Sequence, residues 1–534
     1  MIIYWGIKVL ILGVPIIKAQ VPTYADDIAC IMYSHCTKCH HPGGIGPMSF
    51  MDYTQTANYA QAILNMVEGA SNKTHHLSTE MPPWPPDNTY QKYAYDPTLT
   101  PQEIQAIRDW VNHGTPQGNP SNAPNPPSYS SQGSIPNPDF SDKIQTFTSN
   151  ASNDDVYRYF AIPTNFSTNK FISEWEILPG NPEIVHHVLI FVDPTGNALI
   201  DEANDPNPGY YKPTNSAFSD YKLVGVWAPG QLKFTAPAGF GYKLEPNAAI
   251  VLQIHYPAGS IGQVDSTRIQ LRFANGTTRE LYTSAPLNHA TNSLQNGPLF
   301  IPANTTKSFT ETFTVPNLYD LTVIAVAPHM HLIGRSIETY GVKPNGDTLK
   351  FIRINNWNFS WQGNYFFQKP IKVPKQTVLW SNAFYDNTSN NPFNPSTPPQ
   401  DVWVGEATTD EMMMTFFTFA LYMQGDENII IDTSIHAEHH NYCSMLTHSQ
   451  SPSTNLQNSA SVFPNPVQKV ATVLTSSPME KLELWDYQGR VLGRWNTQNL
   501  KSFEMDLSWI PSGCYFFNVY YSNHTQESVQ FLKQ

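Results

Sequence analysis

Short apolar runs, separated by Pro, Gly, Asn and Ser, make up most of this chain. Between residues 141 and 448 the runs are rich in β-branched and aromatic residues, as in "VHHVLIFV" and "LTVIAV", and no long amphipathic helix interrupts them. Apolar runs of this kind, bounded by turn residues, are typical of strands. The pattern predicts two β-sandwich, jelly-roll-like domains over residues 141–285 and 286–448.

Helical patterns occur nearer the start of the chain. "YTQTANYAQAILNMVEGA" predicts one helix, and "TPQEIQAIRDWVNHG" predicts another. In the second stretch Thr100 is placed to cap the helix, Pro101 stands at its first position, Glu103 completes a capping box and Gly114 ends it. Residues 21–118 are therefore predicted to form a small all-α domain.

The remaining segments divide the chain. Residues 119–140 and 449–460 are rich in Pro, Ser and Asn and predict linkers. Residues 461–534 return to short strands and turns and predict a small β-sandwich. Residues 1–20 carry one early lysine and a short apolar core, which predicts a cleaved signal peptide because the core is too short to span a bilayer.

Charge and composition narrow the class of protein. The 534 residues exceed what one hydrophobic core supports, and 43 acidic against 30 basic residues give a net charge of −13. Such a chain would repel nucleic acid, so no nucleic-acid partner is expected. With 45 prolines and only 14% charged residues, the composition favours exported β-rich modules.

The stretch "HCTKCHH" contains a CxxCH motif. Cys36 and Cys39 have the spacing that forms thioethers to haem, and His40 can supply an axial nitrogen. Met81, in the proline-flanked loop "EMPPWPPD", is the favoured sixth ligand. The other candidates for that ligand are Met48, His75 and His76.

Helices around a CxxCH motif and a methionine loop resemble a cytochrome c domain of the kind fused to exported bacterial enzymes. The resemblance covers residues 21–118 and implies one covalently bound haem c.

Imidazoles and a thioether recur in the two β regions. His329 and His331, in "APHMHLIG", are two apart at a strand end and so face the same side. His186 and His187 are neighbours, which point to opposite faces of a regular strand and can share an ion only at a bulge or strand end. His255 and Met412 complete the set of candidate ligands.

The ordered set HH, H, HxH, DEM resembles the copper type II ascorbate-dependent monooxygenases, the peptidylglycine and dopamine hydroxylase family. The resemblance implies an electron-transfer copper on His186, His187 and His255, and an oxygen-binding, catalytic copper on His329, His331 and Met412. It implies that O2 is used to hydroxylate a C–H bond of an organic substrate. Because the fused haem can pass electrons singly, we expect it to replace or relay ascorbate, reduced by an external donor.

Three positions bear on the substrate. Peptide-amidating members of that family bind a carboxylate through an arginine, an asparagine and a tyrosine, where this chain has Ala327, Met414 and Phe416. The replacements cannot pair with a carboxylate, so a small apolar or uncharged substrate is expected.

The tail, with its opening "PNP" and the stretch "DLSWIPSGCYFF", is similar to the sorting domain of type IX secretion. This implies handling by the type IX machinery, export across the outer membrane, and release or surface attachment without a transmembrane segment in the mature protein. The three cysteines outside the haem motif are far apart along the chain, which argues against a disulfide. They are Cys30, Cys443 and Cys514.

Other functions stay open from the sequence. The stretch "SIHAEHHNYCSMLTH" could belong to a type 1 copper site of a nitrite-reductase-like or electron-transfer protein, but no suitable methionine follows it. A surface binding protein without catalysis is the third class. The sequence identifies neither the substrate, the reductant nor the oligomeric state.

Overall fold

The computed structural model describes residues 21–69, 81–129, 133–231, 233–431, 460–463, 467–486, 490–521 and 526–533. Two compact units make up the chain, residues 1–448 and 449–534. The predicted signal peptide, residues 1–20, lies outside the described residues. So do residues 432–459, which include most of the second linker and the cluster His436, His439, His440, Cys443 and His448.

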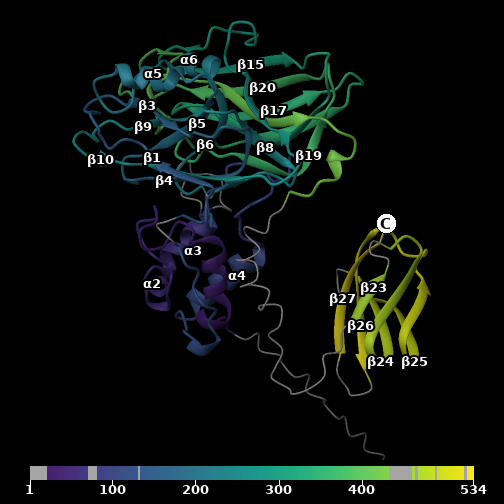
Figure 1. Cartoon of the computed structure of the whole chain (residues 1–534). Helices are drawn as coiled ribbons and strands as arrows, with labels where there is room; N and C mark the ends of the chain where they lie inside the picture. Colours follow the sequence, from purple (N-terminus) through teal and green to yellow (C-terminus); the bar gives the residue numbers. More distant parts are fainter. Residues whose placement is uncertain are drawn as a thin grey trace, which may run out of the picture. The chain divides into compact units, whose positions relative to one another are not determined.

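The first unit begins with helices (Figure 1). The capping box predicted at Thr100 and Glu103 is present, with Pro101 in the first turn. Apolar side chains of these helices, among them Ile28 and Trp110, form a buried cluster of their own. The helices are η1 (Tyr24–Ile28), α1 (Ala29–His35), α2 (Tyr53–Asn58), α3 (Ala60–Gly69), α4 (Pro101–Asn112) and the short η2 (Pro120–Asn122).

Two main sheets form the first β region, with two short helices beside them. A six-stranded sheet has the order β1-β11-β4-β8-β12, with β7 also paired to β4, and a four-stranded sheet has the order β3-β9-β5-β6. The strands of the larger sheet are β1 (Phe140–Lys143), β4 (Lys170–Leu178), β7 (Phe234–Thr235), β8 (Phe240–Leu244), β11 (Arg268–Phe273) and β12 (Arg279–Glu280). Those of the smaller are β3 (Val156–Pro163), β5 (His187–Asp193), β6 (Lys222–Trp227) and β9 (Ala249–Tyr256). Outside them lie β2 (Phe147–Thr148), β10 (Val264–Asp265), α5 (Asn197–Asn204) and α6 (Thr214–Asp220).

The second β region repeats the two-sheet arrangement. Its sheets have the orders β13-β22-β16-β19 and β15-β20-β17-β18. The first contains β13 (Tyr282–Leu287), β16 (Leu321–His329), β19 (Tyr365–Val373) and β22 (Met414–Leu421). The second contains β15 (Thr306–Thr314), β17 (Gly334–Val342), β18 (Thr348–Ile354) and β20 (Val378–Asp386). A short pair, β14 (Phe300–Ile301) and β21 (Val402–Trp403), and the turn η3 (Asp426–Asn428) complete it. Sheets in pairs over buried cores agree with the predicted β-sandwich class.

The two β regions pack on each other. One buried cluster contains Val188 and Leu252 of the first region together with Ile324 and Phe366 of the second. Another joins Leu189 and Phe191 of β5 to Met414 and Phe416 of β22. The strands that carry the candidate ligands, β5 and β9 in one region and β16 and β22 in the other, therefore share a buried interface.

Residues 84–95, expected to belong to the small all-α domain as part of its methionine loop, instead pack on the second β region. Pro86 and Tyr93 make antiparallel bridges to Ile354 and Phe367, and the Tyr93 hydroxyl donates to the Phe351 carbonyl at 2.8 Å. Tyr93 is 2% exposed and belongs to the core of that region. The loop that begins at Met81 is thus continuous with a segment built into the second β region.

The first linker makes defined contacts along the helices. The Asn122 side chain donates from Nδ2 to Asp26 Oδ1 at 2.7 Å, and the Tyr129 ring stacks on His41 with centroids 4.1 Å apart. The Tyr129 hydroxyl also lies 2.8 Å from the Thr37 hydroxyl. Residues 119–129 therefore lie against the helical segment and its CxxCH motif, whereas the amides of Ser134 and Ile135 donate to Glu176 of β4.

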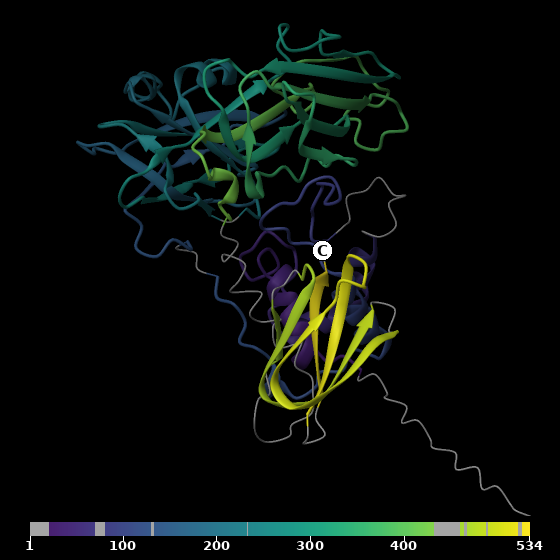
Figure 2. The same ribbon diagram turned by 90° about the vertical axis from the view of Figure 1, so that its right-hand side faces the viewer.

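The C-terminal unit is a five-stranded sheet with the order β23-β24-β26-β27 and β25 paired to β24 (Figure 2). Two long strands shift register where they bend, and the buried side chains Leu484 and Phe517 contribute to a separate core. The strands are β23 (Ala460–Phe463), β24 (Val470–Asp486), β25 (Val491–Asp506), β26 (Gly513–Tyr521) and β27 (Gln526–Lys533).

One expectation about cysteines was wrong. Cys30, on α1, is disulfide-bonded. Separation along the sequence argued against a bridge, but a disulfide depends on the distance between Cα atoms in the folded chain, which the sequence does not give.

Candidate metal centre

Three histidines converge at one end of the smaller sheet in the first β region. His187 opens β5 and stands directly opposite His255 on β9. His186 lies just before β5, and its amide donates to the His255 carbonyl at 3.0 Å. Because His186 is outside the regular strand, it can turn its ring to the same side as His187. The predicted difficulty with neighbouring histidines is resolved by this strand end.

The geometry of these histidines suits a metal ion. Their Nδ1 atoms form a triangle with sides of 3.2, 3.2 and 3.3 Å. A point equidistant from the three atoms lies about 1.9 Å from each, close to zinc–imidazole bond lengths of about 2.0–2.1 Å. Within the described residues, His186, His187 and His255 form a group with the spacing of metal ligands.

Asp155 holds the third histidine. Its Oδ2 lies 3.3 Å from His255 Nε2, on the side of the ring away from Nδ1. Burial alone would raise the pKa of Asp155, but the adjacent His255 ring and the Ala258 amide, which donates to Oδ1 at 3.0 Å, lower it below its ordinary value. A carboxylate on one ring nitrogen fixes the tautomer and leaves the other nitrogen free for a metal. The Tyr157 ring stacks on His255 with centroids 4.4 Å apart.

The second set of candidate ligands lies where β16 and β22 pair. His329 is the last residue of β16 and faces Met414 in the register of the two strands, while Met412 lies two residues before β22. His331 follows His329 by two residues and is 3% exposed. The rings of His329 and His331 have centroids 5.0 Å apart.

Other side chains orient these two imidazoles. The Nδ1 atom of His329 is hydrogen-bonded to Gln362 Oε1, and that of His331 lies 3.0 Å from the Asp410 carbonyl. With each Nδ1 atom donating to an oxygen, the Nε2 atoms are left as the metal-binding nitrogens.

Glu411 joins the histidine turn to the methionine. This carboxyl is 0% exposed and accepts from the amides of His331, Ile333 and Met412 at 2.8, 2.9 and 3.1 Å. Burial raises its pKa to about 8, although those amides oppose the shift. The side chain therefore fixes the relative position of two segments that are far apart in the sequence.

Burial keeps the imidazoles neutral, as ligands must be. Burial first, and then the neighbouring His255, lowers the pKa of His186 to about 4. The same two causes place the pKa of His187 well below its ordinary value. Burial also lowers the pKa of His329 to about 4 and that of His331 to about 3.

Both ligand sets border one cavity of about 350 Å³. His186 and His187 line it from the first β region, and His329, His331 and Met412 line it from the second. Among the described residues around it none is Lys or Arg, and Glu406 is the one carboxylate. Its apolar wall consists of Leu189, Phe218, Val226, Phe359, Met414 and Phe416.

The CxxCH residues lie at the end of α1. Cys36 and Cys39 are free thiols, and the His40 Nδ1 atom lies 3.1 Å from the Met48 carbonyl, which leaves Nε2 for another partner. Met48 packs against the helical core. Met81 is 39% exposed and its amide donates to the Met66 carbonyl at 3.4 Å. His75 and His76 lie outside the described residues.

Most of the side chains that support the ligands were not predictable from the sequence. Asp155, Phe359 and Gln362 have no pattern that marks them, because their contacts depend on the fold. Glu411 could have been found, since it lies inside the "DEM" motif.

Comparisons with known proteins bear on two regions. Residues 294–449 match the family described as copper type II ascorbate-dependent monooxygenase, C-terminal domain. This match points to a copper-dependent monooxygenase and contains His329, His331 and Met412. Residues 461–533 match the secretion system C-terminal sorting domain, which indicates export to the cell surface or secretion. Neither matched region covers the helical segment or the three-histidine group.

Similarity to solved structures is distant. The major capsid protein P2 from Bacteriophage PM2 is 7% identical with a TM-score of 0.24, and the match covers 54% of this chain and 98% of that one. PNGase F, a glycosylasparaginase from Flavobacterium meningosepticum, is 9% identical with a TM-score of 0.24, and the match covers 53% and 96%. No curated protein matches the chain. In the described part of the chain, no helix has the length and apolar character needed to cross a bilayer.

Proposed function

We propose that this chain is a secreted dicopper monooxygenase that hydroxylates a C–H bond of a small apolar or uncharged substrate with O2. One observation carries the proposal. Five of the six candidate ligands, drawn from two β regions, line a single cavity, and the sixth, His255, completes the triangle with His186 and His187.

The donor set fits copper. Imidazole binds both copper states, and the Met412 thioether favours Cu(I). Copper at these ligands would store an electron at the three-histidine site and activate O2 at the site with the methionine. The cavity between the sites is of a size that small ligands occupy, since such pockets are commonly about 300–1,000 Å³.

The protein's own side chains then have separate tasks. Asp155, Gln362 and the Asp410 carbonyl set the tautomers of the imidazoles, and Glu411 holds Met412 beside the histidine turn. Burial disfavours a second proton on each ring, so the imidazoles are neutral at neutral pH and each keeps one nitrogen free for a metal. These contacts hold the ligands in position before a metal binds, so that little rearrangement is needed when the metal changes oxidation state.

Substrate class follows from the cavity wall. Met414 and Phe416 form part of it, and no cation among the described lining residues could pair with a carboxylate. An apolar or uncharged molecule would bury itself against the aromatic wall, at about 25 cal/mol for each Å² of apolar surface.

The helical segment supplies electrons in this proposal. Cys36 and Cys39 would hold a haem c, with His40 and Met81 as axial ligands. Two free thiols at the right spacing and an imidazole fixed through Nδ1 are the donors such a group needs. An external donor would reduce the haem.

Metal analysis of the mature protein tests the proposal. Two coppers and one iron per chain are expected, with a type II copper EPR signal. His187→Ala and His329→Ala should each retain one copper, and His113→Ala, which changes an exposed histidine just after α4, should retain two.

The second part of the test uses O2. When the reduced, copper-loaded protein is mixed with O2, the haem Soret and α bands should report oxidation. One copper or none in the unmodified protein, or haem oxidation unchanged by His329→Ala, would contradict the proposal.

A further inference from the structure

The CxxCH motif lies against loops that border the metal cavity. A Cβ atom built on Gly230 would be 3.2 Å from Cys39 Sγ, 3.1 Å from Ile45 Cδ1 and 3.3 Å from Trp361 Cη2. Gly230 has φ of +84°, and it follows the strand β6, which pairs with β5 of the three-histidine site. The sulfur of Cys39 and the ring of Trp361 therefore both approach Gly230 and lie at most about 6.5 Å apart.

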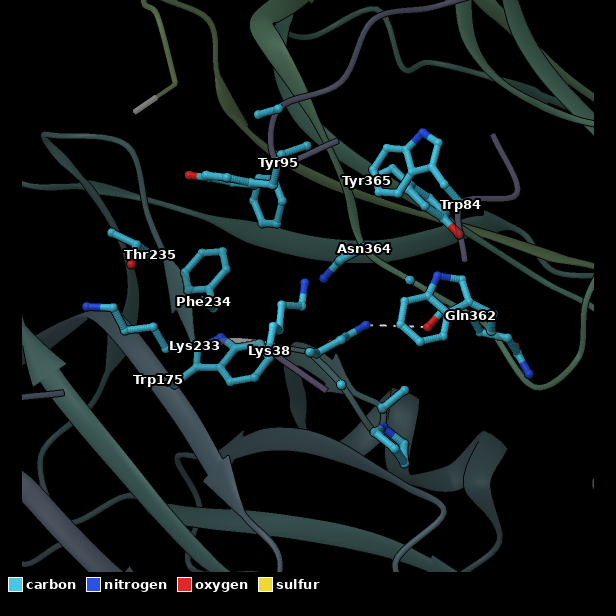
Figure 3. Close-up of a pocket in the computed structure, with 18 of the residues that line it drawn as sticks. Lys38, Trp84, Tyr95, Trp175, Lys233, Phe234, Thr235, Gln362, Asn364 and Tyr365 are labelled. Carbon is cyan, nitrogen blue, oxygen red and sulfur yellow. Dashed lines mark hydrogen bonds between the residues drawn. The ribbon is translucent and has the colours of Figure 1, made fainter. Parts of the chain in front are cut away.

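A small pocket beside Gly230 contains the side chain of Lys38 from the CxxCH motif (Figure 3). Lys38, between the two cysteines, projects among Trp175, Gln362 and Asn364 in that view. Burial lowers the pKa of Lys38. This pocket has a volume of about 120 Å³ and shares a wall with the metal cavity. The residues that line both are Ala228, Pro229, Ser360 and Gln362.

One loop, Asn358–Gln362, has side chains near the CxxCH motif and near both sets of candidate copper ligands. The Gln362 side chain is hydrogen-bonded to His329, and its neighbour Trp361 faces Cys39 across Gly230. Phe359 lies between the ligand sets, stacked on His186 with centroids 5.8 Å apart and edge-on to His331 at 5.7 Å.

The same loop is held in place. Gln362 Nε2 donates to the Phe359 carbonyl at 2.9 Å, the Trp361 amide donates to the Asn358 carbonyl at 3.0 Å, and the Gln231 side chain donates to the Gln362 carbonyl at 3.4 Å. Its contacts with the thiol and with the imidazole are therefore fixed relative to each other.

We propose that the loop Asn358–Gln362 is the electron bridge of this protein: Trp361 and Gln362 connect the Cys39 thioether to His329, and Phe359 connects the two metal sites. The inference rests on the proposed function and adds to it the point of entry, the site with the methionine. In the step one electron leaves ferrous haem, which becomes ferric, and reduces Cu(II) to Cu(I). No bond is made or broken and no proton moves.

The bridge is tested by flash reduction of the haem. In the full-length protein, loaded with haem and two Cu(II) ions and kept anaerobic, a photoexcited deazaflavin reduces the haem. Decay of the ferrous α band then measures transfer to copper, and freeze-quenched EPR measures the Cu(II) signal lost in parallel. Copper-free protein should show no decay.

Two variants interrupt the bridge at different points. Trp361→Leu removes the ring beside Cys39, and Gln362→Leu removes the hydrogen bond to His329. Each should slow the decay about tenfold or more, equivalent to about 1.4 kcal/mol in the barrier. Trp361→Phe should retain most of the rate. Trp380→Leu is the matched control, because Trp380 of β20 is also half-buried, but its ring stacks on Tyr340 of β17.

The outcomes separate this inference from the proposed function. Unchanged decay in both Trp361→Leu and Gln362→Leu overturns the bridge, while two coppers and oxygen-dependent haem oxidation would still support the monooxygenase. A slowing in Trp380→Leu equal to that in Trp361→Leu also overturns it. Protein that binds neither haem nor a second copper overturns the proposed function and the bridge together.

Discussion

Replacing Glu411 with alanine should both destabilise the second β region and weaken its metal site. The carboxyl is fully buried and accepts from three backbone amides, those of His331, Ile333 and Met412. Each buried N–H group left without an acceptor costs about 1–3 kcal/mol. We take the lower end because removing a buried carboxyl also relieves its own desolvation cost. The expected loss is about 3 kcal/mol.

That loss is large enough to measure in copper-free protein. For a cooperative unit of roughly 150–250 residues, about 3 kcal/mol lowers Tm by about 6–12 °C. Glu411→Gln keeps one acceptor oxygen and should show about half the effect. Glu427→Gln, which changes an exposed carboxylate in the same region, should leave Tm unchanged. Calorimetric melting curves of the four proteins provide the comparison.

Metal binding gives an independent readout. Glu411 orients Met412 and His331 but none of the three histidines in the first β region. Competition with a Cu(I) chelator should therefore show about 10–100-fold weaker binding at one site and unchanged binding at the other. If Glu411→Ala has the same Tm as the unmodified protein and binds both coppers with the same affinities as that protein, the carboxyl has no positioning role.

Three further outcomes are expected. Asp155→Asn should weaken Cu(II) binding at the three-histidine site about 10–100-fold in a chelator competition, because the His255 tautomer is no longer held. Asp154→Asn, which changes the exposed neighbouring residue, should leave the affinity unchanged. Equal affinities of the two variants would contradict this role of Asp155. Phe416→Ala should weaken binding of toluene to the metal cavity about tenfold by calorimetry, and an unchanged affinity would remove Phe416 from the substrate wall. The pair His35–Glu103, 3.1 Å apart, should make the helical segment most stable between pH 4.5 and 6.5. Burial would raise the pKa of Glu103, but His35 lowers it from 4.5 to about 2, so the contribution of Glu103 to stability is lost as pH falls through about 2. Burial would lower the pKa of His35, but Glu103 raises it above 6.5, so the contribution of His35 to stability is lost as pH rises through that raised value. Denaturant midpoints against pH should lose both slopes in Glu103→Gln, and retention of both would show that another pair is responsible.

Local rules were sufficient for some of this structure. The helix at Pro101–Asn112 was predictable because a capping box and a proline in the first turn act within a few residues. The strand-end position of His329 was predictable because an apolar run ends there. Both features depend on neighbours in the sequence.

Other features depend on contacts between distant segments. Whether His186 lies inside β5 is decided by pairing with β9, so the sequence alone left the convergence of His186 and His187 open. "PPWPPDNTYQKYAY" has the composition of a loop, yet Tyr93 enters the core of the second β region because Tyr365 and Phe367 offer aromatic partners there. Phe359 and Asp155 gain their roles only from the fold.

The insertion of residues 84–95 into the second β region has a kinetic consequence. Trp84 and Tyr93 contact Tyr365 edge-on or tilted, at 5.2 and 5.8 Å between centroids, so the polypeptide that bears Met81 is anchored to the core of the second β region, the region that would hold the methionine copper site under the proposed function. A carrier anchored in this way needs no diffusive encounter with its acceptor. Its internal rate should be first order, the same in dilute and concentrated samples, and insensitive to added salt, unlike the exchange between separate redox partners.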